Sequence, residues 1–183
     1  MIAVGCGENL ANYVKNVESV LIMTIAIAQA DYENQEHRML IPMLLNEYAC
    51  DPMGGGEPLK PSVRDALVDE LVKVPGAITL LAFNDSEPVG LMNSFIGFST
   101  FAAKPLINIH DVYVRQQWRG QGVSSLMLQR IEQIARELNC CKLTLEVLSN
   151  NRSAMKSYIK FGFSDYQLDP ETGNALFWQK ALT

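Results

Sequence analysis

The sequence is poor in the residues that build metal and redox sites. It contains two histidines, His37 and His110, and four cysteines, of which Cys140 and Cys141 are adjacent and none belongs to a CxxC pair. A protein zinc site draws three or four closely spaced ligands from such residues, so no metal is expected. We interpret the cysteines as reduced, packed thiols, which are typical of a cytoplasmic protein.

Long apolar runs and basic clusters are also missing. The longest apolar stretch, VLIMTIAIA at 20–28, has nine residues, whereas a membrane-spanning helix needs about 20. Glu8 and Glu18 precede this stretch and no small-residue cleavage site follows it, which argues against a signal peptide. The formal net charge is −5, and the footprint of a nucleic-acid-binding protein is basic. We therefore expect neither a membrane nor a nucleic acid as a partner.

Acidic side chains are concentrated between residues 31 and 70. This segment holds nine acids against three bases, a net charge of −6 where the whole chain carries −5. Two explanations stay open. The acids cover the solvated faces of surface helices, or they attract a cationic substrate.

Hydrophobic periodicity and turn residues predict one mixed α/β domain over residues 1–183. About seven strands are expected, at 19–28, 77–83, 89–101, 106–114, 142–148, 163–169 and 175–182. Four helices are expected, at 31–50 with an interruption near Pro42, at 62–74 with Ser62 as N-cap, at 122–138, and at 152–162 with Gly162 as the closing residue.

A glycine-containing turn, QQWRGQGVSS at 116–125, joins the strand predicted at 106–114 to a helix. The first backbone N–H groups of a helix have no intrahelical acceptor and favour an anion. Glycines at 120 and 122 would let a phosphate approach the backbone; a turn that needs glycine only for its geometry is the alternative. A dinucleotide fold is disfavoured because Ser125 stands where its motif requires a third glycine. A P-loop is excluded because no Lys-Ser or Lys-Thr follows the glycines at 54–56.

Two segments together resemble the signature regions of the GCN5-related N-acetyltransferase (GNAT) family. The first, within 106–127, fits the pattern Q/R-x-x-G-x-G/A with Gln117, Gly120 and Gly122, or two residues later with Arg119, Gly122 and Ser124. The second, within 143–163, fits V-x-x-x-N-x-x-A-x-x-x-Y-x-x-x-G-F with Val147, Asn151, Ala154, Tyr158, Gly162 and Phe163. The resemblance is specific over about residues 76–182.

This resemblance implies a GNAT fold with a sheet that splays between its fourth and fifth strands, and acetyl-CoA as the co-substrate. In the family the pyrophosphate rests on the glycine turn, which here implies Arg119, Gly120, Gln121, Gly122, Val123, Ser124 and Ser125. The pantetheine arm pairs with the fourth strand at Val112, Tyr113 and Val114, and the second signature contributes Asn151, Ala154 and Tyr158.

The implied chemistry is direct acetyl transfer to an amine. The family uses the tyrosine at position 158 to protonate the leaving sulfur. The base stays open between His110, Asp111 and an ordered water. Because neighbours in a strand point to opposite faces, we expect only one of the two side chains to face the thioester, with His110 on the face of Val112 and Val114. The backbone N–H near Val112 is the expected donor to the thioester carbonyl.

The acceptor is expected between the helices at about 31–74 and the final hairpin. The acidic bias there favours a small cationic primary amine. Two alternatives are an acetyltransferase of protein lysines or N-termini, and a non-catalytic acyl-CoA-binding module. Phe177 and Trp178 are expected in the core or on the surface of a possible homodimer.

Overall fold

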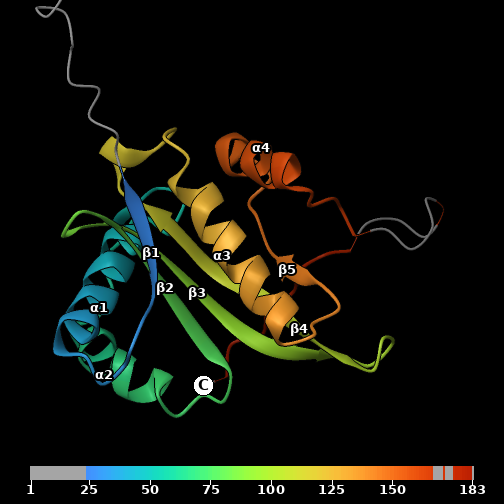
Figure 1. The fold of residues 1–183 in the computed structure, drawn as a ribbon, viewed down its shortest axis with the longest axis horizontal. Coiled ribbons are helices and arrows are strands. Elements are labelled where there is room, and N and C mark those ends of the chain that lie inside the picture. Colours follow the sequence, from blue (N-terminus) through green and yellow to red (C-terminus); the bar gives the residue numbers. More distant parts are fainter. Residues whose placement is uncertain (1–23, 167–170, 172–174, 183) are drawn as a thin grey trace, which may run out of the picture.

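A mixed β-sheet forms the centre of the protein (Figure 1). The computed structural model describes residues 24–166, 171 and 175–182, and within them the sheet has five strands in the order β1-β2-β3-β4-β5. The strands are β1 (Ile25–Gln29), β2 (Ala77–Asn84), β3 (Glu87–Ser99), β4 (Lys104–Val114) and β5 (Leu143–Leu145). The first three pairings are antiparallel, and β4 pairs with β5 in parallel.

Helices cover both faces of this sheet (Figure 1). The described helices are α1 (Gln35–Cys50), α2 (Pro61–Leu71), α3 (Val123–Glu137) and α4 (Arg152–Phe161). The alternation of side chains along each strand separates two cores. Leu81, Leu91 and Tyr113 face α1 and α2, whereas Leu80 and Met92 face α3.

Capping residues explain where several helices begin and end. The side chain of Asn34 accepts hydrogen bonds from the first turn of α1, and the side chain of Asn151 caps α4 in the same way. Gly162 closes α4 with a φ of +109°, as the sequence predicts. Ser62 is not the N-cap of α2. The helix begins at Pro61, whose missing N–H is not needed at the first helical position.

Pro42 does not interrupt α1, contrary to the sequence-based expectation. The helix continues through it from Gln35 to Cys50. Proline removes one backbone hydrogen bond, but the neighbouring Ile41 and Leu44 are fully buried against the sheet. Tertiary packing therefore holds the segment helical in spite of the lost donor.

The C-terminal part of the predicted sheet differs from the structure. The strand predicted at 175–182 forms no strand pairing, and the one predicted at 163–169 falls partly outside the described residues. Phe177 and Trp178 are 76% and 82% exposed, and no strand in the described part of the chain covers them. Apolar and aromatic composition favours a strand only where another strand is available to pair. The predicted dimer surface at these two residues stays a prediction.

A β-bulge in β4 changes which way its side chains point. Asn93 of β3 lies opposite Asp111, but the next residue, Ser94, lies opposite Ile109, so His110 has no partner across the pair. Before the bulge Ile109 faces α3, and after it Val112 also faces α3. One extra residue has thus shifted the alternation by one position.

β4 and β5 separate soon after the bulge. Their pairing ends at Ile109, opposite Leu145. Residues 110–114 of β4 therefore have no strand beside them on that edge within the described part of the chain. This is the splay that the GNAT resemblance implies, and it leaves backbone edge exposed between the two halves of the sheet.

Candidate active site

The glycine turn presents a row of free backbone amides. Gly120 and Gly122 have φ values of +77° and +86°, and Gly122 is the residue before the first turn of α3. Among the described residues, no hydrogen-bond acceptor is bound by the backbone N–H groups of 120–125. A Cβ at either glycine would meet no atom within 4 Å. The turn is therefore an open cradle of donors at the positive end of a helix.

Two side chains of this turn are directed away from the cradle. The guanidinium of Arg119 donates to Asp51 Oδ2 at 2.7 Å and to the carbonyl oxygen of Val114 at 2.8 Å. Gln121 Nε2 donates to the carbonyl of Gln117 at 2.7 Å. Asp51 thus binds the charge of Arg119 in this structure. These side chains brace the loop, and the backbone provides the donors.

Asp51 and Glu47 tie the end of α1 to the end of β4. Glu47 forms a two-point ion pair with Arg115, with distances of 2.9 and 2.7 Å, and accepts a further bond from the Tyr113 hydroxyl at 3.3 Å. Hydrogen bonding to Glu47 raises the pKa of Arg115, and the backbone N–H of Met53 together with Arg119 lowers the pKa of Asp51. These contacts hold the C-terminal end of α1 against the end of β4 and the glycine turn.

Tyr158 lies on α4 beside the separated end of the sheet. Its ring packs edge-on against Phe163, with ring centroids 5.8 Å apart. Burial, and secondarily the charge that Tyr48 would carry, raises the pKa of Tyr158 to about 12. Burial also raises the pKa of Tyr48, and the negative charge of Asp111 adds to this effect. Tyr48, Tyr158 and Asp111 are thus brought within electrostatic reach of one another from α1, α4 and β4.

The raised pKa of Tyr158 predicts a late step in an alkaline titration. The phenol ionises near pH 10 in the unfolded chain and near pH 12 in the fold, so its stabilising contribution is complete below pH 10 and is lost as pH rises toward 12. Tyrosinate absorbance should therefore show one of the six tyrosines ionising last, at about pH 12. Tyr158→Phe should remove that step, and its persistence in this variant would assign the step to another tyrosine.

His110 and Asp111 lie on the same side of the sheet, contrary to the expectation from strand alternation. The His110 ring lies 5.7 Å from the ring of Phe95, which packs in the core under α1 and α2. Asp111 accepts a hydrogen bond from Asn93 Nδ2 at 3.0 Å on that face. His110 does not share a face with Val112, because the bulge at 110 places Val112 against α3.

A sequence profile of the Acetyltransferase (GNAT) family matches residues 41–163. The chain belongs to the GNAT family. It is 31% identical to a bovine (Bos taurus) thialysine N-epsilon-acetyltransferase over 104 residues, which cover 54% of this chain and 55% of that enzyme. It is 28% identical to the mouse (Mus musculus) enzyme of the same name over 144 residues, which cover 79% of this chain and 77% of that enzyme. The first of these matches thus spans about half of the relative's length.

Solved structures share the fold. The crystal structure of a probable acetyltransferase superposes with a TM-score of 0.70 at 26% identity and covers 86% of this chain and 99% of its own. AAC(6')-Iy, solved with the bisubstrate analogue CoA-S-monomethyl-acetylneamine, superposes with a TM-score of 0.68 at 15% identity, covering 87% of this chain and 99% of its own. At that identity the second likeness shows the fold alone.

The residues of this GNAT chain fit a pyrophosphate at the glycine turn. The free amides of 120–125 and the open space at Gly120 and Gly122 form a cradle that a Cβ would fill. The unpaired edge of β4 at Val112 and Tyr113 is available to an extended arm. The carbonyl of Val114 is already bound by Arg119, so the arm would pair with β4 before that residue.

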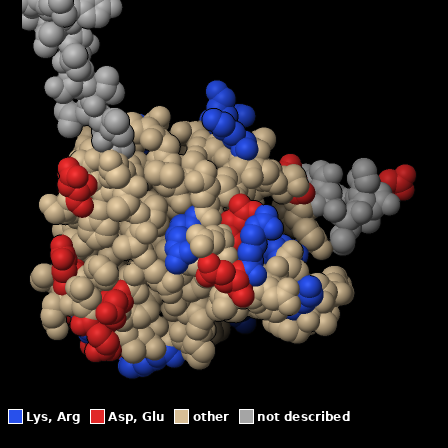
Figure 2. Space-filling view, in the orientation of Figure 1, with Lys and Arg blue, Asp and Glu red and all other residues tan. Residues whose placement is uncertain are grey.

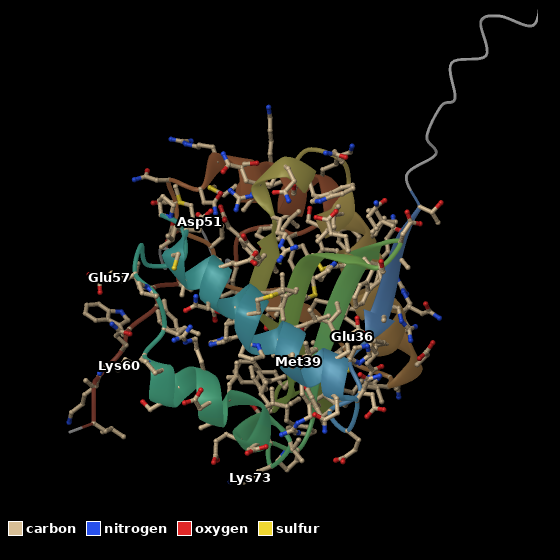
Figure 3. All side chains as sticks on the ribbon, turned by 90° about the vertical axis from the view of Figure 1, so that its left-hand side faces the viewer. Glu36, Met39, Asp51, Glu57, Lys60 and Lys73 are labelled. Atoms are coloured by element: carbon tan, nitrogen blue, oxygen red, sulfur yellow. The ribbon has the colours of Figure 1, made fainter. Side chains whose placement is uncertain are left out.

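Electrostatics on the α1 side differ from the acidic surface expected from composition. Four of the nine acids in 31–70 are in ion pairs, formed by Glu47, Asp51, Asp69 and Glu70. Figure 3 places Glu36 and Glu57 at opposite ends of the α1–α2 layer. Ion pairs therefore neutralise part of the charge of this segment.

The face of the molecule drawn in Figure 2 carries side chains of both charges. On the face in Figure 2, acidic and basic side chains lie next to one another over α3, where Arg130 pairs with Glu137 and Arg136 pairs with Glu132. The described residues contain no cluster of three or more side chains suited to a metal ion. In the same part of the chain, no helix combines the length and hydrophobicity needed to cross a bilayer.

Sequence reasoning missed Tyr48, Glu47 and Asn93. Glu47 and Arg115 are 68 positions apart, and Asn93 reaches Asp111 only through strand pairing. Tyr48 does carry a local signal, since it follows the buried Leu44 by four positions on α1 and so lies on the inward face.

Proposed function

We propose that the protein transfers an acetyl group from acetyl-CoA directly to the primary amine of a small cationic metabolite. The observation that carries this proposal is the placement of Tyr158. Its partly buried side chain packs in the same core as Val112 and Val114 at the unpaired end of β4. The free amides of 120–125 follow this end of β4, and Asp111 lies on the α1 side of the sheet.

In the proposed reaction the acceptor nitrogen must first lose a proton. An alkyl ammonium with a pKa near 10.4 is neutral in only about one molecule in 2,500 at pH 7. His110 lies at the bulge on the acceptor side, where its imidazole can accept that proton directly or through a water. Asp111 supplies a negative charge that binds the ammonium form.

The nitrogen then attacks the thioester carbon, a C–N bond forms, and the C–S bond breaks. The backbone N–H at Val112 donates to the carbonyl oxygen as negative charge develops on it. Tyr158 gives its proton to the departing sulfur. The attacking nitrogen releases its second proton to solvent as the amide forms, and a proton from solvent restores Tyr158. With a pKa of about 12 the phenol is fully protonated at neutral pH, as a proton donor must be.

Thialysine is the first acceptor to test. Relatives from two mammals carry the name thialysine N-epsilon-acetyltransferase, and thialysine is a small molecule with a primary amine on a short chain. The half-buried Asp111 fits one ammonium group.

The proposed compartment is the cytoplasm.

A two-stage experiment tests this function. Acetyl-CoA at 100 times its dissociation constant should stabilise the fold by about 2.7 kcal/mol and raise Tm by roughly 5–10 °C, while NAD and ATP should not. Turnover is then measured with thialysine, spermidine, sisomicin, a lysine peptide and a neutral amine. Preference for the peptide would indicate a protein acetyltransferase, and cofactor binding without any turnover would indicate a binding module; either result contradicts the proposal.

A further inference from the structure

A chain of four polar side chains crosses the α1–α2 face of the sheet and ends on Asp111. The Tyr32 hydroxyl lies 3.0 Å from Thr79 Oγ1. Thr79 Oγ1 donates to Asn93 Oδ1 at 2.7 Å, and Asn93 Nδ2 donates to Asp111 Oδ2 at 3.0 Å. The four residues come from the turn before α1 and from β2, β3 and β4.

Strand register brings the central members together. Thr79 lies directly opposite Asn93 across the β2–β3 pair, and Asn93 lies directly opposite Asp111 across the β3–β4 pair. Thr79 is 1% exposed and Asn93 is 3% exposed. Buried polar groups are costly unless each finds a partner, and here the partners are one another. The pair with Asp111 is also the last in register before the bulge at His110.

The direction of each hydrogen bond follows from the donor count. A threonine hydroxyl has one proton, and Thr79 uses it on Asn93. Tyr32 must therefore donate to Thr79. The Asp111 carboxylate only accepts hydrogen bonds, so it takes the amide nitrogen of Asn93, and the amide oxygen is left for Thr79. Thr79 and Tyr32 thus hold the end of the amide that lies away from the carboxylate.

We propose that Asn93 is a positioning residue for the acceptor amine, acting through Asp111. Its amide N–H holds Oδ2 of the carboxylate and so directs Oδ1 toward the acceptor's ammonium. Thr79 and Tyr32 anchor the amide oxygen of Asn93 on the other side, which keeps its N–H on Asp111. This inference rests on the proposed amine acetyltransferase function.

The test compares Thr79→Val with Thr79→Ser. Valine keeps the shape of threonine and removes the hydroxyl, whereas serine keeps the hydroxyl. We expect Thr79→Val to raise KM for thialysine at least about tenfold, with KM for acetyl-CoA unchanged, and Thr79→Ser to stay close to the wild type. Asn93→Leu should give an equal or larger rise, and Tyr32→Phe a smaller one, since Tyr32 is two hydrogen bonds from Asp111.

The readouts separate positioning from support of the fold. Equal KM values for thialysine in the valine and serine variants would overturn the inference, as would a parallel rise in both KM values with a lowered Tm. If Thr79→Val does not fold, Tyr32→Phe is used in its place. Tyr32 is half-buried at the far end of the hydrogen-bonded series from Asp111, and KM for thialysine in this variant is compared with that of the wild type. The wild type is measured first against thialysine, spermidine and sisomicin. Absence of turnover with all three would refute the proposed function, and with it this inference.

Discussion

Tyr158→Phe is expected to lower kcat for acetyl transfer by about 10²–10³-fold while acetyl-CoA affinity stays within about threefold. Phenylalanine keeps the ring that packs against Phe163 and removes only the hydroxyl. Without that donor the sulfur must leave as an unprotonated thiolate or take its proton from water. A loss confined to kcat is the signature of an interaction made in the transition state. Single-turnover rates with thialysine and binding of acetyl-CoA by calorimetry measure the two quantities separately.

Tyr166→Phe is the matched control for this variant. Tyr166 carries the same hydroxyl eight residues along the chain and is exposed, so its loss should leave kcat unchanged. A full rate in the Tyr158→Phe enzyme would remove the general acid from the proposed mechanism. An equal loss of acetyl-CoA affinity would instead make Tyr158 a binding residue.

Gly122→Val is expected to weaken acetyl-CoA binding on the order of 100-fold, which corresponds to about 2.7 kcal/mol. The φ of +86° disfavours a β-branched side chain. The added methyls would also stand in the open space where the amides of 120–125 face a phosphate. Charge-assisted hydrogen bonds to a ligand are worth about 1.5–3 kcal/mol each, so losing one or two of them gives the expected effect. Isothermal titration with acetyl-CoA measures it.

Gly122→Val could act in two ways, by straining the backbone or by blocking the amides that bind the cofactor, and a control variant separates the two. Gly56 offers the matched control, because its φ is +80° and a Cβ there also meets no atom within 4 Å. Gly56→Val should lower the Tm of the free protein about as much as Gly122→Val does. Only the Gly122 variant should lose affinity for acetyl-CoA. Equal affinity in both variants would mean that the glycine turn does not hold the cofactor.

Local patterns in the sequence were sufficient to predict the glycine turn and the helices α3 and α4. The apolar stripe of α3 and the glycine before it are contiguous in the chain, and Gly122 does precede the first turn of that helix. Gly162 closes α4 as predicted, and Asn151 caps the start of this helix. Each of these features depends on residues within a few positions of one another, so periodicity and capping preferences determine it.

The acceptor side depends on contacts between distant segments and could not be predicted in the same way. The side of the sheet that His110 and Asp111 face depends on a β-bulge, and this bulge becomes visible only in the pairing of β3 with β4. The Glu47–Arg115 ion pair joins residues on separate elements. Composition suggested that the acids of residues 31–70 could attract a cationic substrate, but some of them are already neutralised by ion pairs of this kind. Charge counts along a sequence do not show which charges are already matched.

The bulge makes His110 an extra residue within β4. The pairing of β4 with β3 uses every residue from 104 to 114 except His110. Removing that residue would leave Ile109 and Val112 facing α3 and Asp111 facing α1, as in a regular strand. Position 110 therefore behaves as an insertion within the strand: deleting it would restore the regular alternation and would remove the ring contact with Phe95. A substitution at 110 changes the side chain offered beside Asp111 and leaves the pairing register of β3 and β4 as it is.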